Sequence, residues 1–151
     1  MEKRALLSLD KYVPFHFHPY TAFDVAVKSA NDPQKMMYLC ISREYARRKG
    51  FKIIPKHPLS LDEFECYDYD RGFNMIDWQT LTKKGETTTY AKEVKMAECV
   101  SPRTIGINEF ICLYVPNLEI KKRVNEVLLS VRNRIDYLPY INIQEEWFAK
   151  A

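Results

Sequence analysis

The sequence predicts a single α+β domain over residues 1–151, and three observations indicate this class. The chain has 151 residues, of which 46% are hydrophobic, which is enough for one core. Segments with the two-residue period of strands alternate irregularly with segments of helical period, without the regular strand-helix-strand order of a parallel fold. Glycine occurs only 4 times, whereas there are 10 tyrosines and 8 phenylalanines, so we expect an aromatic-rich core.

Residues 13–18 are the first predicted strand. Their sequence, Val-Pro-Phe-His-Phe-His, alternates apolar side chains with a proline and two histidines, as in a half-buried strand. Pro14 has no N–H group to donate, so we expect one side of this strand to be unpaired or bulged. Such a strand suits the floor of a binding cleft, and an ordinary edge strand with solvated histidines explains the same pattern.

The next elements follow from periodicity and from turn residues. Asn31-Asp32-Pro33 ends a predicted helix over 22–30, and Gly50 stands where a helix C′ glycine belongs. Residues 36–42 are nearly all apolar, which predicts a central strand buried on both faces. The first half of the chain then also contains a predicted helix over 43–49, a strand over 51–54, a helix over 60–66 and a turn over 67–72.

The second half begins with a helical turn over 75–81 and the loop-like stretch 83–89. Residues 90–100 fit either a helix or a strand. Asn117 can cap a helix whose apolar stripe comprises residues 120, 124, 127, 128, 131 and 135. Strands are predicted over 109–115 and 140–143, and Trp147 and Phe148 are expected to pack the C-terminus against the core.

Composition excludes several classes of protein. No apolar run approaches the roughly 20 residues of a membrane span, and the first residues lack the apolar segment of a signal peptide. The net charge of +3 permits an anionic partner without requiring one. Cys40, Cys66, Cys99 and Cys112 have no zinc-binding spacing and lie among apolar residues, so we expect buried free thiols in the cytoplasm.

Three groups of residues could carry chemistry. His16 and His18, two apart on one strand face, could bind one metal ion, but the sequence identifies no third ligand. Basic residues concentrate between Arg43 and Lys56, where they could bind phosphates beside Tyr45 and Phe51, or simply form a solvated helix face. Glu93 follows the polar loop and enters an apolar segment, as a carboxylate at the mouth of a strand would. The P-loop, the dinucleotide fingerprint and the nucleophile elbow are all absent.

Several motifs occur in the order of a known family. Residues 11–20, Lys-Tyr-Val-Pro-Phe-His-Phe-His-Pro-Tyr, include a Tyr-Val-Pro-Phe-aromatic-Phe-x-Pro pattern. Ile76-Asp77-Trp78 contains an Asp-Trp pair, and residues 89–94 are similar to a Tyr-Gln-Ala-Glu motif. With the later strand, helix and tryptophan-aromatic pair, this order resembles the DarT family. Members of that family use NAD to ADP-ribosylate thymidine bases of single-stranded DNA.

The resemblance implies an ADP-ribosyltransferase-like fold, with two small sheets, peripheral helices and NAD held between the sheets as a substrate. No metal is expected. Glu93 aligns with the catalytic glutamate, which would stabilise the ribose cation and assist proton removal from the thymine nitrogen. Residues 83–92 would present the base. The resemblance also implies the toxin half of a toxin–antitoxin pair, with a cognate antitoxin as a possible partner.

This chain is shorter than the family at its N-terminal end, where members carry a histidine, an asparagine and an arginine that bind NAD. Arg4 is the one candidate for that arginine. The residues expected to bind NAD are Arg4, Tyr12, Phe15, His16 and His18, and those expected to bind DNA are Arg43, Arg47, Arg48, Lys83, Lys84 and Tyr90. Two other functions remain open: a catalytically silent relative that binds single-stranded nucleic acid or a protein, and a small metal-dependent enzyme.

Overall fold

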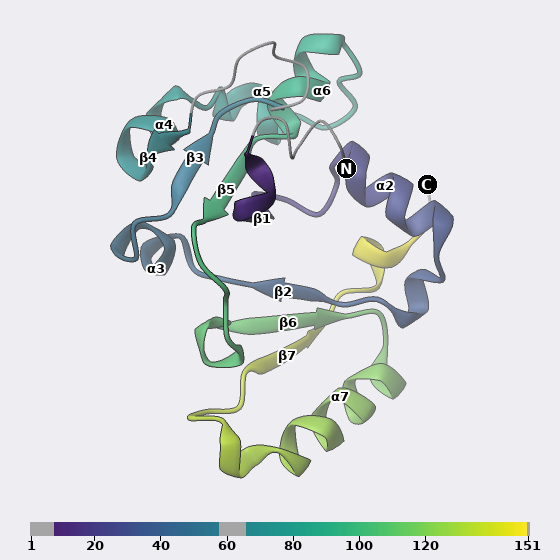
Figure 1. The fold of residues 1–151 in the computed structure, drawn as a ribbon. Helices are drawn as coiled ribbons and strands as arrows, with labels where there is room; N and C mark the ends of the chain where they lie inside the picture. The colour runs from purple at the N-terminus through teal and green to yellow at the C-terminus, as the bar shows by residue number, and fades with distance from the viewer. Residues whose placement is uncertain (1–7, 58–65, 151) are drawn as a thin grey trace. The chain divides into compact units, whose positions relative to one another are not determined.

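The computed structural model describes residues 8–57 and 66–150, and it has the α+β class that the sequence predicts (Figure 1). The chain forms two compact units, each assembled from separate segments of the sequence. Unit 1 comprises residues 1–23 and 43–105, and unit 2 comprises residues 24–42 and 106–151. Residues 60–65 of the predicted helix over 60–66 lie outside the described residues.

Unit 1 contains an antiparallel sheet with the strand order β1-β5-β3-β4 (Figure 1). The strands are β1 (Val13–His16), β5 (Glu98–Ser101), β3 (Lys52–Ile54) and β4 (Tyr67–Asp68). Strand β1 lies at the edge of the sheet, as the proline at position 14 predicts. Strand β5 lies between β1 and β3, and all four of its residues are buried.

Helix α3 (Arg43–Arg48) ends as the sequence predicts. Gly50 has a φ of 70°, a left-handed conformation that costs glycine little because it lacks a Cβ. The Gly50 N–H donates to the Arg47 carbonyl at 3.1 Å, and the Phe51 N–H donates to the Ala46 carbonyl at 3.0 Å. This pair of bonds is a Schellman motif, which reverses the chain into β3.

Helix α4 (Tyr69–Met75) corrects the predicted turn over 67–72. The polar, acidic sequence there is typical of a turn, but tertiary packing decides the outcome. Gly72 is buried against β3, and a Cβ built on it would lie 2.5 Å from Ile53 Cβ. The missing side chain therefore lets the helix approach the sheet closely, and Tyr69 of the same helix is buried, with its ring stacked on that of Phe73.

Helices α5 (Trp78–Thr82) and α6 (Thr89–Lys95) flank the loop that the sequence places near 83–89. Asp77 caps α5 through the Thr80 N–H at 3.0 Å, and Thr88 caps α6 through the Ala91 N–H at 3.2 Å. The ambiguous stretch 90–100 is therefore part helix and part strand, since α6 ends just before β5 begins.

Unit 2 contains the sheet β2-β6-β7, in which β2 (Tyr38–Cys40) is antiparallel to β6 (Cys112–Val115) and β7 (Tyr140–Ile143) is parallel to it. The prediction of a central strand over 36–42 is wrong, because β2 lies at the sheet edge and Leu39 is 45% exposed. Leu39 therefore exposes apolar surface at the edge of this sheet.

Helix α7 (Leu118–Ser130) connects β6 to β7 and packs on their sheet. The Asn117 side chain accepts the Ile120 N–H at 3.0 Å, as predicted. Leu128 is buried with Leu113, Val115 and Ile141. Val127 is 64% exposed, so its predicted place on the apolar stripe is wrong. No helix among the described residues has the length and apolar character needed to cross a membrane.

The C-terminal segment packs within unit 2 as predicted. Phe148 is 1% exposed, and the Trp147 carbonyl accepts a hydrogen bond from Lys28 Nζ at 3.1 Å. Lys28 lies on α2 (Ala22–Ala30). Short 3-10 turns complete the fold, namely η1 (Leu9–Lys11), η2 (Pro33–Lys35), η4 (Ile107–Glu109), η5 (Arg132–Arg134) and η6 (Glu145–Phe148).

The four cysteines are free thiols, but only Cys99 is fully buried. Cys40, Cys66 and Cys112 are half-buried, so the expectation of four buried thiols is only partly correct. Burial raises the pKa of Cys40 and of Cys99 to about 12, which keeps these two thiols protonated at neutral pH.

We expect Gly72→Ala to lower the free energy of unfolding by about 1–3 kcal/mol, because the added methyl group must displace Ile53 or separate α4 from β3. Alanine in an unstrained helix would instead stabilise it, by up to about 1 kcal/mol. Gly106→Ala is the matched control, since its Cβ would meet only Glu109 Oε2 at 3.7 Å. Urea denaturation followed by tryptophan fluorescence measures both changes, and equal stability of the two variants would contradict this packing.

Candidate active site

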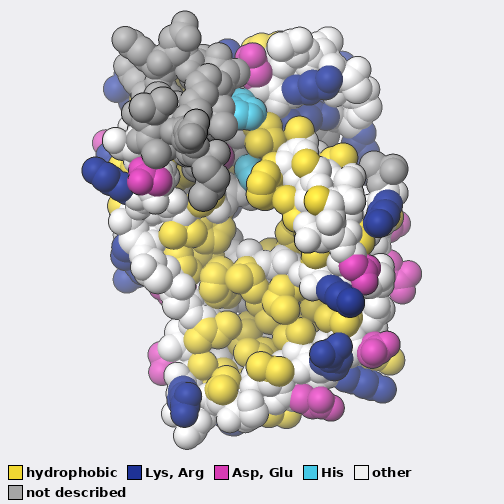
Figure 2. All heavy atoms as spheres, turned by 45° about the vertical axis from the view of Figure 1, so that its right-hand side comes forward, with side chains coloured by type: hydrophobic (Ala, Val, Ile, Leu, Met, Phe, Trp, Pro, Cys, Tyr) yellow, Lys and Arg dark blue, Asp and Glu magenta, His cyan; other side chains and the backbone are white. Residues whose placement is uncertain are grey.

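Strands β1 and β5 bring a histidine and a carboxylate together on one face of the unit 1 sheet. His16 and Glu98 are directly opposite each other in the register, so their side chains project to the same side. His16 Nε2 lies 4.0 Å from Glu98 Oε1, and the two side chains are 18% and 4% exposed. Figure 2 shows histidine side chains reaching the molecular surface.

Glu98 is a functional candidate that the sequence analysis missed. A carboxylate withdrawn from water is destabilised unless another polar or charged group compensates it, and the imidazole of His16 can do so when protonated. The available signal was one acidic residue inside the apolar run Met96-Ala97-Glu98-Cys99-Val100. Among the four residues of β5, Glu98 is the one with a charged side chain.

The predicted NAD-binding residues divide between the two faces of this sheet. Tyr12 packs against Leu9, Ile54 and Val100, on the face that also carries Glu98. Phe15 lies on the opposite face, where its ring centroid is 6.1 Å from that of Phe51. The structure therefore places Tyr12 and His16 with Glu98 and places Phe15 apart from them. Arg4 lies outside the described residues.

His18 connects the end of β1 to α6. Its Nδ1 accepts the Tyr20 N–H at 3.2 Å, so Nε2 carries the proton of the neutral ring and donates to the Lys95 carbonyl at 2.9 Å. The interpretation of His16 and His18 as solvated edge histidines is therefore wrong. Within residues 8–57 and 66–150, no group of three His, Cys, Asp or Glu side chains is placed to hold a metal ion.

Glu93 lies on α6, three residues after the exposed Tyr90, and not at the mouth of a strand as expected. Its carbonyl accepts the His57 N–H at 2.8 Å, which ties the helix to the chain after β3. Its side chain is half-buried, and its carboxylate forms no hydrogen bond or ion pair with the residues that the structure describes. Glu93 is thus positioned by its backbone, and its carboxylate is available.

Tyr90 and Asp77 link the two helices beside the loop. The Tyr90 hydroxyl donates to Asp77 Oδ2 at 3.0 Å, and Lys56 Nζ lies 5.0 Å from the Tyr90 ring centroid. Asp77 also accepts the Thr80 hydroxyl at 2.6 Å. Hydrogen bonds from Thr80 hold the pKa of Asp77 below its usual value, and the bond to Asp77 raises the pKa of Tyr90. The exposed Tyr90 ring is therefore fixed in orientation.

Arg43 lies against a cluster of three aromatic rings. Its guanidinium carbon is 4.9 Å from the Trp78 centroid, 5.7 Å from Phe17 and 5.8 Å from Phe73. The Trp78 indole N–H donates to the Phe73 carbonyl at 3.0 Å, which fixes the central ring. Cation–π contacts of this kind orient a guanidinium without neutralising it.

The other predicted DNA-binding cations differ in their surroundings. Arg47 donates two hydrogen bonds to Asp70, at 2.6 and 3.0 Å, and Lys83 pairs with Glu86 at 3.0 Å. These two cations are therefore already partnered by carboxylates. Lys84 is exposed in the loop, and Arg48 lies over the Tyr45 ring at 5.7 Å.

The architecture matches that of known ADP-ribosyltransferases. Thermus sp. 2.9 DarT in complex with NAD+ superposes with a TM-score of 0.80 at 18% identity, covering 93% of this chain and 74% of that one. The same protein in complex with ADP-ribosylated ssDNA also gives 0.80 at 18% identity, covering 93% and 70%. Thermosipho africanus DarTG in complex with ADP-ribose gives 0.61 at 13% identity, covering 91% and 36%. The chain therefore has the ADP-ribosyltransferase-like fold.

The family follows from the sequence as a whole. A family model described as ssDNA thymidine ADP-ribosyltransferase, DarT, matches residues 2–149. The chain therefore belongs to the DarT family, which confirms the resemblance drawn from its motifs. A comparison with curated proteins gives no match.

We expect Asp77→Asn to move the pKa of Tyr90 back toward its ordinary value of 10.0, because asparagine keeps the helix cap but removes the charge that holds the phenol proton. The pKa of Asp77 is depressed, so its stabilising contribution is present above 3.8 and is lost as pH falls through the folded-state value. A pH titration of the ¹³C-tyrosine NMR signals measures the phenol, with the other tyrosines as internal references. An unchanged Tyr90 midpoint would contradict the contact.

Proposed function

We propose that this protein transfers ADP-ribose from NAD to the thymine base of single-stranded DNA. The observation that carries the proposal is the buried Glu98 side chain 4.0 Å from His16, on the same sheet face as Tyr12. Membership of the DarT family supports the reaction, and Thermus sp. 2.9 DarT has been captured with NAD+ and with ADP-ribosylated ssDNA.

The reaction needs a group that stabilises positive charge. The bond between the ribose C1′ and the nicotinamide nitrogen breaks, and nicotinamide leaves with the bonding electrons. A thymine nitrogen then bonds to C1′, and its proton must pass to a base or to water. A carboxylate close to C1′ can stabilise the cationic ribose and hold a ribose hydroxyl.

Two carboxylates are candidates for this role. The resemblance assigns it to Glu93, whose carboxylate is available but half-exposed on α6. Burial favours Glu98, because charge–charge attraction is stronger where water is excluded, and because a central strand holds a side chain more rigidly than a short helix beside a loop. His16 can orient the Glu98 carboxylate from β1.

The stretch 83–92 is proposed to present the base. Tyr90 offers an exposed ring that its bond to Asp77 holds in place, and base–aromatic stacking stabilises single strands by about 1–3 kcal/mol per base. Lys84 adds positive charge for the neighbouring phosphates, and Lys83 can do so where a phosphate replaces Glu86 as its partner. Arg43, oriented by Trp78, can bind a further phosphate.

The biological setting is proposed from the resemblance. The protein would act as the toxin half of a toxin–antitoxin pair and would require a cognate antitoxin. Its free thiols suit the cytoplasm, where thiols stay reduced.

We expect a thymidine-containing single-stranded oligonucleotide to gain the mass of one ADP-ribose when it is incubated with the protein and NAD. Intact-mass spectrometry measures the gain, and an oligonucleotide of the same length without thymidine serves as the control. No gain with either oligonucleotide would contradict the proposed function, and retained binding of the strand would then identify a silent binding protein.

We expect Glu98→Gln to lower the rate of transfer by about 10²–10⁴-fold, because the amide keeps the shape of the side chain but cannot supply its charge. Glu93→Gln is the matched variant and is expected to have the smaller effect. Initial rates are compared at saturating NAD, with circular dichroism to check folding. A large loss in Glu93→Gln together with a small loss in Glu98→Gln would reverse the two assignments.

A further inference from the structure

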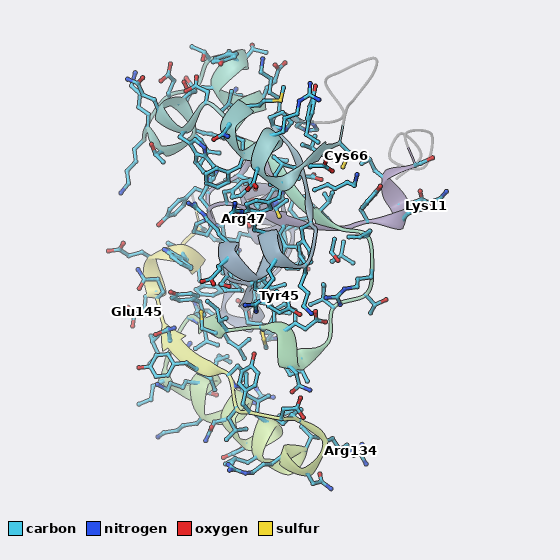
Figure 3. The ribbon with its side chains drawn as sticks, turned by 90° about the vertical axis from the view of Figure 1, so that its left-hand side faces the viewer. Lys11, Tyr45, Arg47, Cys66, Arg134 and Glu145 are labelled. Carbon is cyan, nitrogen blue, oxygen red and sulfur yellow. The ribbon has the colours of Figure 1, made fainter. Side chains whose placement is uncertain are left out.

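Tyr45 on α3 is surrounded by positive charges. The Arg48 guanidinium carbon and Lys49 Nζ each lie 5.7 Å from its ring centroid, and Arg103 Nη2 donates to its hydroxyl at 3.4 Å. We call Tyr45, Arg48, Lys49 and Arg103 the Tyr45 cluster. Figure 3 labels Tyr45 and Arg47, which lie on different sides of α3.

The fold of unit 1 assembles this cluster from two distant segments. Lys52 of β3 pairs with Val100 of β5 in antiparallel register, so the residues before β3 and those after β5 lie at the same end of the sheet. The Ser101 hydroxyl donates to the Arg103 carbonyl at 2.8 Å, and Arg103 Nη1 donates to the Thr104 carbonyl at 3.1 Å. These bonds hold the Arg103 guanidinium where it reaches Tyr45.

Neighbouring cations of unit 1 form ion pairs with carboxylates, whereas among the described residues Arg48 and Lys49 of the Tyr45 cluster do not. Arg47 is paired with Asp70 at 2.6 Å, and Lys52 is paired with Asp68 at 3.6 Å. Arg48 and Lys49 are exposed, and neither forms an ion pair with a carboxylate of the described residues. Arg48 and Lys49 lie over the same ring, so their positive charges repel each other, and an approaching polyanion relieves this repulsion.

We propose that the Tyr45 cluster binds phosphates of the single strand at a distance from the reacting base. The choice of single-stranded DNA as the ligand rests on the proposed function. Glu98 and Ser101 are three residues apart on β5, about 10 Å in an extended strand, and the cluster lies beyond Ser101. Phosphates are the moiety recognised, because two cations, Arg48 and Lys49, lie over the Tyr45 ring and leave little of it for a base. The exposed Tyr90 ring differs, since Lys56 is the one cation of the described residues that lies over it.

The test compares two double variants. The cluster variant carries Arg48→Gln and Lys49→Gln, and the control variant carries Lys122→Gln and Arg123→Gln. Lys122 and Arg123 are exposed on α7, and their substitution removes two positive charges, as in the cluster variant. Fluorescence anisotropy without NAD measures binding of a labelled single-stranded oligonucleotide between about 50 and 200 mM NaCl. Thermal melting checks that each double variant is folded.

The cluster variant is expected to lose about 25-fold in affinity near 0.1 M salt, with a salt-dependence slope shallower by about 1.4, since each released counterion contributes about 0.7 to the slope for single strands. The control variant is expected to bind as the unchanged protein does. Equal affinities in the two double variants would overturn the inference. The proposed function is tested separately, because this binding measurement needs no NAD. If the protein without substitutions binds the oligonucleotide through the cluster but does not modify it, the proposed function is contradicted and the binding inference is not.

Discussion

The antiparallel pairing of β1 with β5 is the constraint on which the candidate active site depends. It holds His16 opposite Glu98, and the burial of β5 between β1 and β3 secures that register. Because side chains alternate between sheet faces, a slip of β1 by one residue would place His16 opposite Cys99 and turn Phe15 away from Phe51. The same packing that stabilises unit 1 therefore sets the geometry of the histidine–carboxylate pair.

Unit 1 separates its buried charge from its exposed charges. Glu98 lies where water is largely excluded, so its carboxylate acts strongly on a charge close to it and weakly on anything distant. The cations of the Tyr45 cluster and of the loop are exposed, where salt screens single contacts but a set of like charges still attracts a polyanion. Arg43 is an intermediate case, since three aromatic rings orient its charge without pairing it. This division suits a protein that captures a strand with one set of residues and modifies it with another.

Local signals predicted much of this fold. Gly50, Pro14 and Asn117 each act through their own backbone or through a partner within a few residues, so the helix end, the edge strand and the helix cap are readable from the sequence. The predicted turn at 67–72 failed because Gly72 packs against Ile53, a contact between distant residues. Family motifs identified the fold correctly, since an order of motifs reflects the whole chain.

The candidate site was harder to predict, for a physical reason. Glu98 is a candidate for the catalytic role because it is buried and lies beside a histidine that is more than eighty residues earlier in the chain. Neither property can be read from local periodicity. The motif resemblance assigns the catalytic role to Glu93, which lies on a helix whose end is held by His57 and His18, and this assignment stays a prediction. Arg103 was likewise overlooked, because only the pairing of β3 with β5 brings it to Tyr45.

The central claim is that NAD binds on the sheet face that carries His16 and Glu98. An NMR titration of histidine-labelled protein with NAD tests this claim most directly. The chain has 3 histidines, His16, His18 and His57, so the ring signals can be assigned with single variants. The account predicts that the His16 signals move most as NAD is added, because its imidazole faces the bound ribose. Signals of His57 that move while those of His16 stay fixed at saturating NAD would contradict it, and would place the substrate beside Glu93.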